Sequence, residues 1–427
     1  MLRLFKRESA CHPERSEGSR ASNGFFLELT LRFFAPLRMT QVGPSYVNFH
    51  LLVFLALLTL VAVVLSLLTY DKSAAAAAAV ETKKGWKSEW EKTLEAAKKE
   101  GEVSIYGPSN RDEQKALVDG FQRAYPDVRV KYVSGRLSEL ASRIMAERRA
   151  GKFIVDILLG STTTPNRTLK PAGVLEPIHS ALILPEILDT SAWFKKKLWF
   201  GDNEERFLIL WRGGSSGSSM INTNLAKREE FSSYWDLLNP RWKGKIAAQD
   251  PRVTGRGYST SVFLYYAKDY GPDYLKRLFG EMEVVLSRDS HQIVDWLGQG
   301  KFAVALFVGS QGEGEMAIRQ GLPITEVEPV KGSGALGTPR TVTFVNGAPH
   351  PNAAKIYINW ILSREGQIAY QKATGTNSLR TDISKDDVNP SELLREDRDY
   401  IPQNLERYEE GARTALKQIF DEVLPQR

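Results

Sequence analysis

The feature that most constrains this chain is an apolar run over Phe49–Thr69, FHLLVFLALLTLVAVVLSLLT, followed by the alanine-rich stretch DKSAAAAAAVETKK. A helix needs about 20 apolar residues to cross a bilayer core, and this run just reaches that length. No similar run follows Val80, so we expect roughly 350 residues to fold in water beyond one export element. An exported domain meets no pool of ATP or NAD, which argues against most cofactor-dependent enzymes.

The residues before the apolar run set its expected orientation. Lys and Arg outnumber Asp and Glu there, and such an excess keeps that end inside, so the C-terminal part lies outside, in the periplasm. Several A-x-A sites in Ala74–Ala79 favour cleavage as a signal peptide, whereas the length of the run favours a retained anchor, and both stay open. Residues 1–46 are interpreted as a poorly structured leader from an over-extended gene start, with Met39 a candidate initiator, and residues 47–80 as the signal peptide or anchor.

Composition limits the chemistry of the exported part. The chain has 427 residues, a hydrophobic content of 42% and a net charge of +6. Beyond Val80 the same count leaves a net charge of about +3, which is no electrostatic footprint for nucleic acid. The single cysteine, Cys11, lies in the leader. A large hydrophobic core must therefore supply the stability that disulfides give to many secreted proteins.

The pattern beyond residue 85 predicts two α/β units. Strands and helices alternate from Val103 with short connections, as in a parallel sheet with right-handed crossovers. The stretch RGGSSGSS at Arg212–Ser219 is flexible by composition, and the strand–helix pattern restarts after it. We predict lobe one over 86–213 and 323–375, lobe two over 214–322, and a helical C-terminal region over 376–427. A cleft between the lobes is the expected binding site.

Three segments resemble one family. They are WKSEWEKTLEAAKKEGEVSIYG, YWDLLNPRWKGKIAAQDPR and VNGAPHPNAAKIYINWILSREGQ, and the similarity extends from about Trp86 to Gly375. This combination resembles the extracellular solute-binding proteins of bacterial ABC importers, in particular the ferric-iron-type branch. The resemblance implies an α/β, type II periplasmic-binding-protein fold with hinge crossings between its two lobes. It also implies a monomer that hands a small-molecule or metal–anion ligand to a membrane permease driven by an ATPase.

Ligand contacts are expected where strands end and helices begin, since open α/β sheets bind ligands there and helix N-termini carry unpaired N–H groups. In lobe one these positions are Ser109, Asn110, Arg136, Ser161, Thr162 and Thr163. In lobe two and on the return crossing they are Arg256, Tyr258, Ser259, Gln311 and Arg340. Asn110 also fits a helix N-cap, and Arg136 a solvated arginine, so both alternatives stay open. The arginines favour an anionic solute or a ferric–anion complex.

Ferric iron would be cargo, and we expect no cofactor. The iron-binding relatives typically use two tyrosines after a late lobe-two strand, where this chain has Val308–Glu313 and no tyrosine. The adjacent pair Tyr265–Tyr266 lies in a predicted helix, where neighbouring side chains point about 100° apart. A bare Fe3+ site is therefore not indicated, and the metal ligands remain unassigned.

Two other functions would need features of their own. A membrane-tethered sensor of the same fold requires a retained anchor and a partner other than a permease. A secreted hydrolase requires catalytic residues, yet the chain contains no H-E-x-x-H or P-loop motif. We therefore expect a binding protein rather than an enzyme.

Overall fold

The computed structural model describes residues 85–216, 219–253, 255–308, 314–327, 329 and 331–425. The apolar run Phe49–Thr69 lies outside the described residues, so the expectations about the leader and the signal peptide or anchor stay predictions. Within the described ranges, no helix is long and apolar enough to cross a membrane. The chain from Glu81 to Arg427 forms one compact unit, which contains both sheets.

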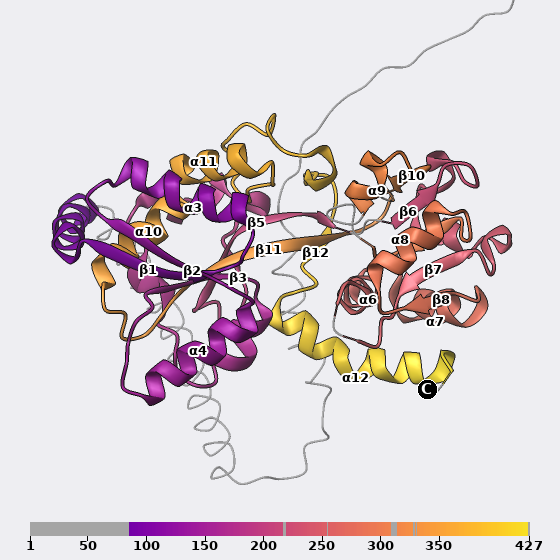
Figure 1. Ribbon diagram of the computed structural model, residues 1–427, viewed down its shortest axis with the longest axis horizontal. Coiled ribbons are helices and arrows are strands. Elements are labelled where there is room, and N and C mark those ends of the chain that lie inside the picture. Colours follow the sequence, from indigo (N-terminus) through magenta and orange to yellow (C-terminus); the bar gives the residue numbers. More distant parts are fainter. Residues whose placement is uncertain are drawn as a thin grey trace, which may run out of the picture. The chain divides into compact units, whose positions relative to one another are not determined.

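Lobe one, as we call the part built around the larger sheet, holds seven strands (Figure 1). In sheet order they are β2 (Arg129–Ser134), β1 (Glu102–Gly107), β3 (Ile157–Gly160), β11 (Gly334–Phe344), β5 (Leu208–Ser216) and β4 (Trp199–Phe200), with β12 (Tyr400–Ile401) beside β11. Strands β2, β1 and β3 are parallel, whereas β11 is antiparallel to both β3 and β5. The parallel sheet predicted from the alternating pattern is thus present in the first half of this lobe.

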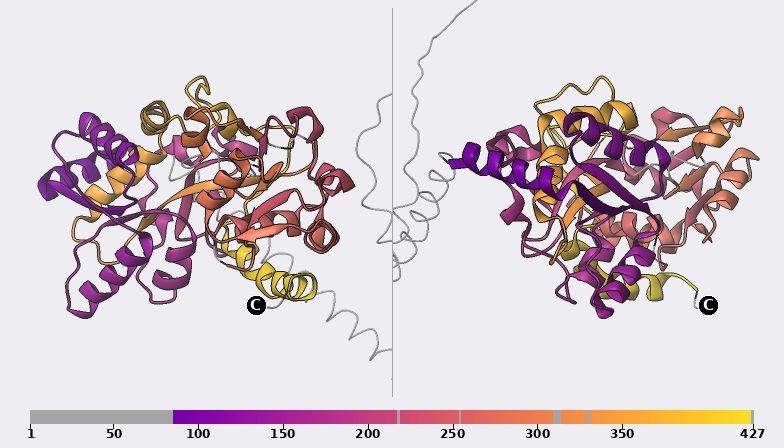
Figure 2. Two further views of the ribbon diagram at one scale, coloured as in Figure 1. Left: turned by 45° about the vertical axis from the view of Figure 1, so that its right-hand side comes forward. Right: turned by 60° about the vertical axis from the view of Figure 1, so that its left-hand side comes forward.

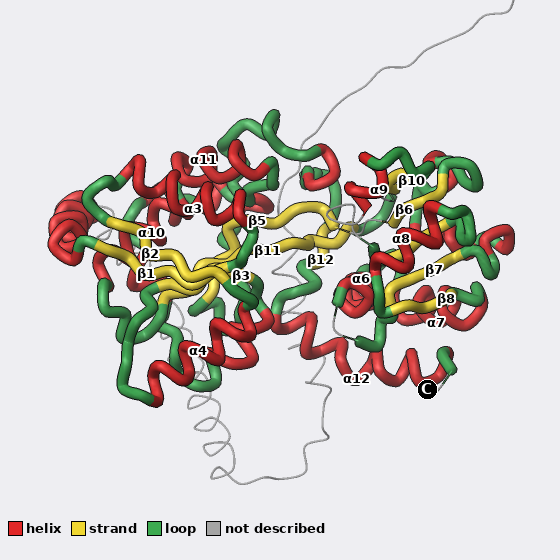
Figure 3. The backbone as a smooth tube through the Cα atoms, in the orientation of Figure 1, coloured by secondary structure: helices red, strands yellow, loops and turns green. Residues whose placement is uncertain are grey.

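Helices cover both faces of the lobe-one sheet. They are a helix over 85–100, α3 (Arg111–Ala124), α4 (Leu137–Arg149), α5 (Pro185–Leu188), α10 (Pro351–Leu362) and α11 (Arg364–Thr374). Helices α3, α10 and α11 pack together, and α4 lies on the opposite side of the strands (Figure 3). The large side chains of Trp193, Trp211 and Trp360 are fully buried in this core. A core of this size is consistent with a stable fold that needs no disulfide.

Lobe two surrounds a sheet of five strands. In sheet order they are β10 (Ile324–Val327), β6 (Ser219–Asn222), β9 (Val304–Leu306), β7 (Ile246–Gln249) and β8 (Val285–Ser287). Its helices are α6 (Arg256–Tyr266), α7 (Gly271–Glu281), α8 (Ser290–Gly298) and α9 (Glu315–Arg319). Because β10 pairs with β6, the chain returns to lobe one after Val327, later than the predicted boundary at 323.

The segment predicted to be a flexible linker is largely a strand. Strand β5 continues to Ser216, and its residues pair with β11 at Arg212↔Arg340, Gly214↔Gly337 and Ser216↔Ala335. A side chain at Gly337 would collide with Ser216, so glycine allows the two backbones to approach. Pairing with a distant strand therefore overrides the flexible composition. The antiparallel pair β5–β11 leads into lobe two at one end, where the C-terminal end of β5 lies beside the N-terminal end of β11.

The C-terminal region is less helical than predicted. Residues 376–405 form loops, a short 3₁₀ helix at Pro390–Glu392 and β12, and only α12 (Glu406–Val423) is a long helix. The guanidinium of Arg398 donates to the carbonyls of Pro329, Gly332 and Ser333, at 2.7, 2.9 and 3.1 Å. These bonds fasten the loop to the return crossing.

Helix α12 joins lobe two through its apolar face. Four of its side chains lie in the lobe-two core: Ala412, Leu416, Ile419 and Phe420. The helix lies against α6 and α7, and both turned views show it beside lobe two (Figure 2). The C-terminal segment, which pairs with lobe one at β12, is therefore a third connection between the lobes.

Candidate functional site

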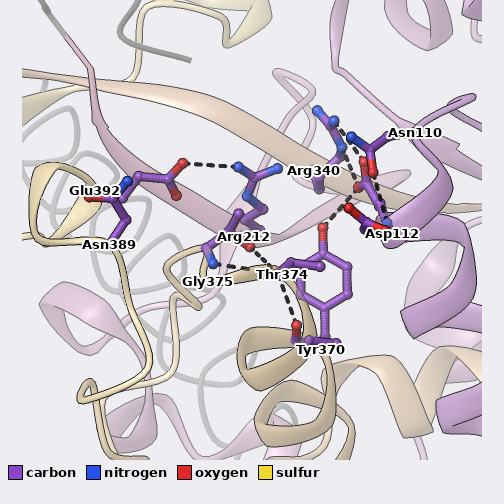
Figure 4. Close-up of a pocket in the computed structure, with 12 residues that line it drawn as sticks. Asn110, Asp112, Arg212, Arg340, Tyr370, Thr374, Gly375, Asn389 and Glu392 are labelled. Carbon is purple, nitrogen blue, oxygen red and sulfur yellow. Dashed lines mark hydrogen bonds and ion pairs between the residues drawn. The ribbon is translucent and has the colours of Figure 1, made fainter. Parts of the chain in front are cut away.

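A pocket of about 450 Å³ lies in lobe one beside the crossing strands (Figure 4). We call it the arginine pocket, and it is lined by Asn110, Asp112, Glu113, Arg212, Arg340, Tyr370, Ala373, Thr374, Gly375, Thr376, Asn389 and Glu392. These residues come from the first turn of α3, from β5 and β11, from the end of α11 and from the 3₁₀ helix near Asn389. The pocket volume falls within the range of small-molecule sites, about 300–1,000 Å³.

The first ion pair of the pocket joins α3 to β11. Arg340 grips the carboxylate of Glu113 with two parallel bonds, Nε to Oε1 at 2.6 Å and Nη2 to Oε2 at 2.9 Å. The hydroxyl of buried Tyr370 donates to the same Oε1 at 2.9 Å. Burial acts to raise the pKa of Glu113, but the hydrogen bonds and charge of Arg340 outweigh it and hold that pKa below its usual value. Glu113 is therefore an ionised carboxylate, fixed by two partners.

The second ion pair joins β5 to the C-terminal segment. Arg212 stands directly across from Arg340 in the strand register, and its Nη2 donates to Glu392 Oε1 at 3.2 Å. The backbone N–H of Asn377 donates to the other carboxylate oxygen at 3.1 Å. Arg212 is 5% exposed, and its buried Nε has no hydrogen-bond partner within the described part of the chain. A buried N–H without a partner costs about 1–3 kcal/mol, so it favours an acceptor in the pocket.

Two helix ends meet at the arginine pocket. The side chain of Asn110 accepts from the N–H of Glu113 at 2.8 Å and so caps α3. Helix α11 ends on Gly375, which adopts a left-handed conformation with φ of 65°. Just there, the hydroxyls of Thr374 and Thr376 bond each other at 2.7 Å. The pocket therefore offers hydroxyls and an amide besides its charged groups.

A second polar cluster lies under α12. We call it the α12 junction, and it consists of Thr163, Arg167, Lys170, Tyr258, Glu406 and Glu409. The carboxylate of Glu409 accepts from Arg167 Nη2 at 2.7 Å and from Thr163 Oγ1 at 3.1 Å, and its backbone oxygen accepts from Tyr258 Oη at 3.0 Å. Lys170 Nζ lies 2.6 Å from Glu406 Oε2. Since Tyr258 belongs to lobe two, this cluster ties both lobes to α12.

The structure divides the residues predicted to bind ligand into separate groups. Asn110 and Arg340 line the arginine pocket, and exposed Ser109 precedes Asn110 without lining it. Thr163 and Tyr258 belong to the α12 junction, and buried Thr162 donates to the carbonyl of Asn404 close by.

The other predicted residues lie apart from the arginine pocket. Arg136 is 85% exposed, with Glu139 at 3.8 Å, and Arg256 is exposed at the start of α6. Ser161 and Ser259 are half-buried. Gln311 lies outside the described residues.

Sequence reasoning missed most of the pocket. It did not identify Glu113, Arg212, Tyr370 and Glu392 as site residues. Glu113 had a signal, because its spacing from Asn110 marks a helix start, but nothing in the spacing connects it with Arg340, 227 residues away. Arg212 sat in a segment interpreted as a linker, and Glu392 in one interpreted as helical.

The structure also shows how the two tyrosines considered as iron ligands are arranged. Tyr265 and Tyr266 both lie in α6, with ring planes at 89° and centroids 5.1 Å apart. Tyr266 also packs against Tyr408 of α12. In the described residues no group of three or more His, Cys, Asp or Glu side chains could hold a metal ion. A metal site built on these four residue types is therefore not found in the described part of the chain.

The fold, its two lobes and a small polar pocket define a solute-binding protein. The model of the bacterial extracellular solute-binding protein family matches residues 107–368. This chain belongs to that family, which confirms the resemblance inferred from the three sequence segments. An uncharacterized protein of Haemophilus influenzae is 25% identical over 294 residues, which cover 64% of this chain and 76% of the relative.

Solved structures confirm the predicted two-lobed α/β fold. A Trichodesmium protein named IdiA or FutA, in complex with iron and citrate, is similar with a TM-score of 0.57 and 16% identity, covering 76% of this chain and 99% of that one. The periplasmic binding protein AfuA of Actinobacillus pleuropneumoniae, with fructose-6-phosphate bound, is similar with a TM-score of 0.51 and 21% identity, covering 76% and 98%. At these identities the likeness concerns the fold.

Proposed function

We propose that this protein is the solute receptor of an ABC importer and works outside the cytoplasm. It captures a small solute that carries an oxyanion group, holds it in the arginine pocket, and passes it to a membrane permease with a cytoplasmic ATPase. Family membership supports the binding role. Two similar structures hold a citrate complex with iron and a sugar phosphate, and both of those ligands contain oxyanions.

The observation that carries the proposal is the pair of arginines that face each other across β5 and β11. A guanidinium has five N–H donors in a fixed fork. Arg340 uses Nε and Nη2 on Glu113, and among the described residues Nη1 has no further partner. Arg212 keeps its buried Nε unpaired. An oxyanion in the pocket would complete the hydrogen bonds of both side chains.

The position of the pocket also suits a receptor that closes on its ligand. Arg212 and Arg340 sit on the two strands that lead into lobe two, and hinge residues of this kind absorb the change in domain closure. A solute bound by both arginines would contact the two strands that connect the lobes. Ferric iron, if carried, would arrive with its own anion, because the described residues hold no group of three or more His, Cys, Asp or Glu side chains placed to bind a metal.

A thermal-shift screen of the purified protein tests the receptor role. Phosphate, citrate, ferric citrate, short carboxylic acids and amino acids are added separately. A ligand at 100 times its Kd stabilises the folded state by about 2.7 kcal/mol, which raises the melting temperature visibly. At least one oxyanion-bearing solute should do so, and a flat response to every one of them would contradict the proposal.

The variant Arg340→Lys tests the pocket itself. Lysine keeps a positive charge beside Glu113, so the buried carboxylate stays paired, but the planar fork is lost. We expect the solute found in the screen to bind at least about tenfold more weakly, which is about 1.4 kcal/mol. Arg136→Lys is the matched control, because Arg136 is exposed and lies outside the pocket. If the two variants bind the solute with equal affinity, the solute does not bind in the arginine pocket.

A further inference from the structure

The arginine pocket is not positively charged overall. Its lining contains two guanidinium groups, those of Arg212 and Arg340, and three carboxylates, those of Asp112, Glu113 and Glu392. Each arginine is already paired with one carboxylate. The third, on exposed Asp112, has no hydrogen bond or ion pair within the described residues. The formal charge of the lining is therefore −1, which disfavours a ligand with several negative charges.

The two ion pairs still leave directional donors. The buried Nε of Arg212 lacks a partner, and Arg340 has Nη1 left after its two bonds to Glu113. Such N–H groups can bind one oxyanion without supplying a net charge for it. A single carboxylate matches these donors. A second negative group would face the remaining carboxylates and lose its hydration without compensation.

Two other features of the pocket lining favour a positive group on the ligand. Glu113 of α3 bonds Tyr370 of α11, so the start of α3 lies next to the end of α11, and Thr374 and Gly375 line the pocket there. The last carbonyls of a helix carry partial negative charge. At the start of α3, the opposite partial charge is met by Asp112 and Glu113 in the first turn. Asp112 and the end of α11 are therefore two negative features of the lining, and Figure 4 shows Asp112 beside Arg340 and Gly375 beside Arg212.

We propose that the solute is a small zwitterion, with its carboxylate on Arg212 and Arg340 and its ammonium group against Asp112 and the carbonyl end of α11. This inference rests on the proposed function and specifies its ligand. The negative group of the solute matches the arginine donors, and its positive group matches Asp112 and the carbonyl end of α11. The volume of about 450 Å³ holds a molecule of amino-acid size with room for bridging water.

Calorimetric titration of the purified protein tests the inference with ligands in which the ammonium group or the carboxylate is blocked. The twenty common amino acids are screened first, and the best binder is compared with its N-acetyl derivative and with its amide. The free amino acid should bind at least about tenfold more tightly than either masked form, about 1.4 kcal/mol for each group. If the N-acetyl form binds as tightly as the free amino acid, or if only citrate or phosphate binds, the proposal of a zwitterionic solute is wrong. The proposed function as a receptor for an oxyanion-bearing solute would then still hold.

The variant Asp112→Asn locates the ammonium subsite. It should weaken the free amino acid about tenfold and leave the N-acetyl derivative unchanged, because that derivative has no ammonium group to lose. Asp127→Asn is the matched control, since Asp127 is exposed on the same lobe and outside the pocket. If Asp112→Asn weakens the binding of both ligands equally, the effect is structural and Asp112 does not bind the ammonium group. If no solute of either class binds, the proposed function falls as well.

Discussion

The arginine pocket and the α12 junction are built from the same kinds of side chain, yet they differ in open volume and in the number of N–H donors without a partner. In the pocket, Arg212 and Arg340 are paired with carboxylates and still line an open volume with unused N–H groups. In the junction, Glu409 accepts three bonds from two lobes and α12 fills the space. The difference teaches that residue type does not separate a binding site from a structural bridge. Open volume and unpaired donors do.

The largest effect should come from breaking the buried pair in the pocket. Glu113→Ala leaves Arg340 without its carboxylate and should lower the free energy of unfolding by about 3 kcal/mol. Glu409→Ala in the junction should cost about 1–2 kcal/mol, because Arg167 is 36% exposed and can turn to water. Urea unfolding of both variants measures the two losses. A larger loss for Glu409→Ala would reverse the comparison.

Two tyrosine-to-phenylalanine variants sharpen the same contrast. Tyr370→Phe removes a buried donor to the ionised carboxylate of Glu113 and should cost about 1.5–2 kcal/mol. Tyr258→Phe removes a bond to the neutral backbone oxygen of Glu409 and should cost about 0.5–1 kcal/mol. Thermal unfolding compares them. Tyr258→Phe should also leave solute affinity within about twofold, and a tenfold loss would restore Tyr258 as a ligand contact.

The smallest effects appear in the pH dependence, at opposite ends of the scale. The pKa of Glu113 lies below 4.5, because the bonds to Arg340 outweigh burial. Its contribution to stability is therefore complete above pH 4.5 and is lost as the pH falls through the folded-state pKa. In unfolding experiments, the difference between the native protein and Glu113→Gln should shrink in acid. A constant difference down to about pH 2 would contradict this.

Lys170 of the junction shows the opposite sign. Burial lowers its pKa, but the bonds to Glu204 and Glu406 prevail and raise it above 10.5. Its contribution is complete below pH 10.5 and is lost as the pH rises through the folded-state pKa. The difference in unfolding free energy between the native protein and Lys170→Met should therefore shrink only in strong alkali. A loss near neutral pH would show that the pair does not form.

Local patterns predicted local structure well. Asn110 and Glu113 marked the start of α3, and the alternation of strands and helices predicted a parallel sheet, because both depend on neighbours in sequence. The resemblance of three sequence segments to one family also predicted the two lobes. Boundaries that depend on distant pairing were placed less well. Strand β5 extends through glycine and serine because β11 lies beside it, and residues 376–405 are held as loops by partners such as those of Arg398.

The candidate site was the hardest part to predict. Its ion pairs join α3 to β11 and β5 to the C-terminal segment, and no spacing rule links such positions. Expecting ligands at strand ends brought Asn110 into the site, but it also selected Thr163 and Tyr258, whose hydroxyls are used by α12. The sequence shows which groups are polar. Only the packed chain shows which of them remain free.

A crystal structure of the protein with the solute that stabilises it tests the central claim most directly. The account predicts electron density for the solute in the arginine pocket, with an oxyanion within hydrogen-bond distance of Arg340 and Arg212 and the α12 junction unchanged. Density for the solute beside Arg256 and Tyr258, with the arginine pocket empty, would contradict it.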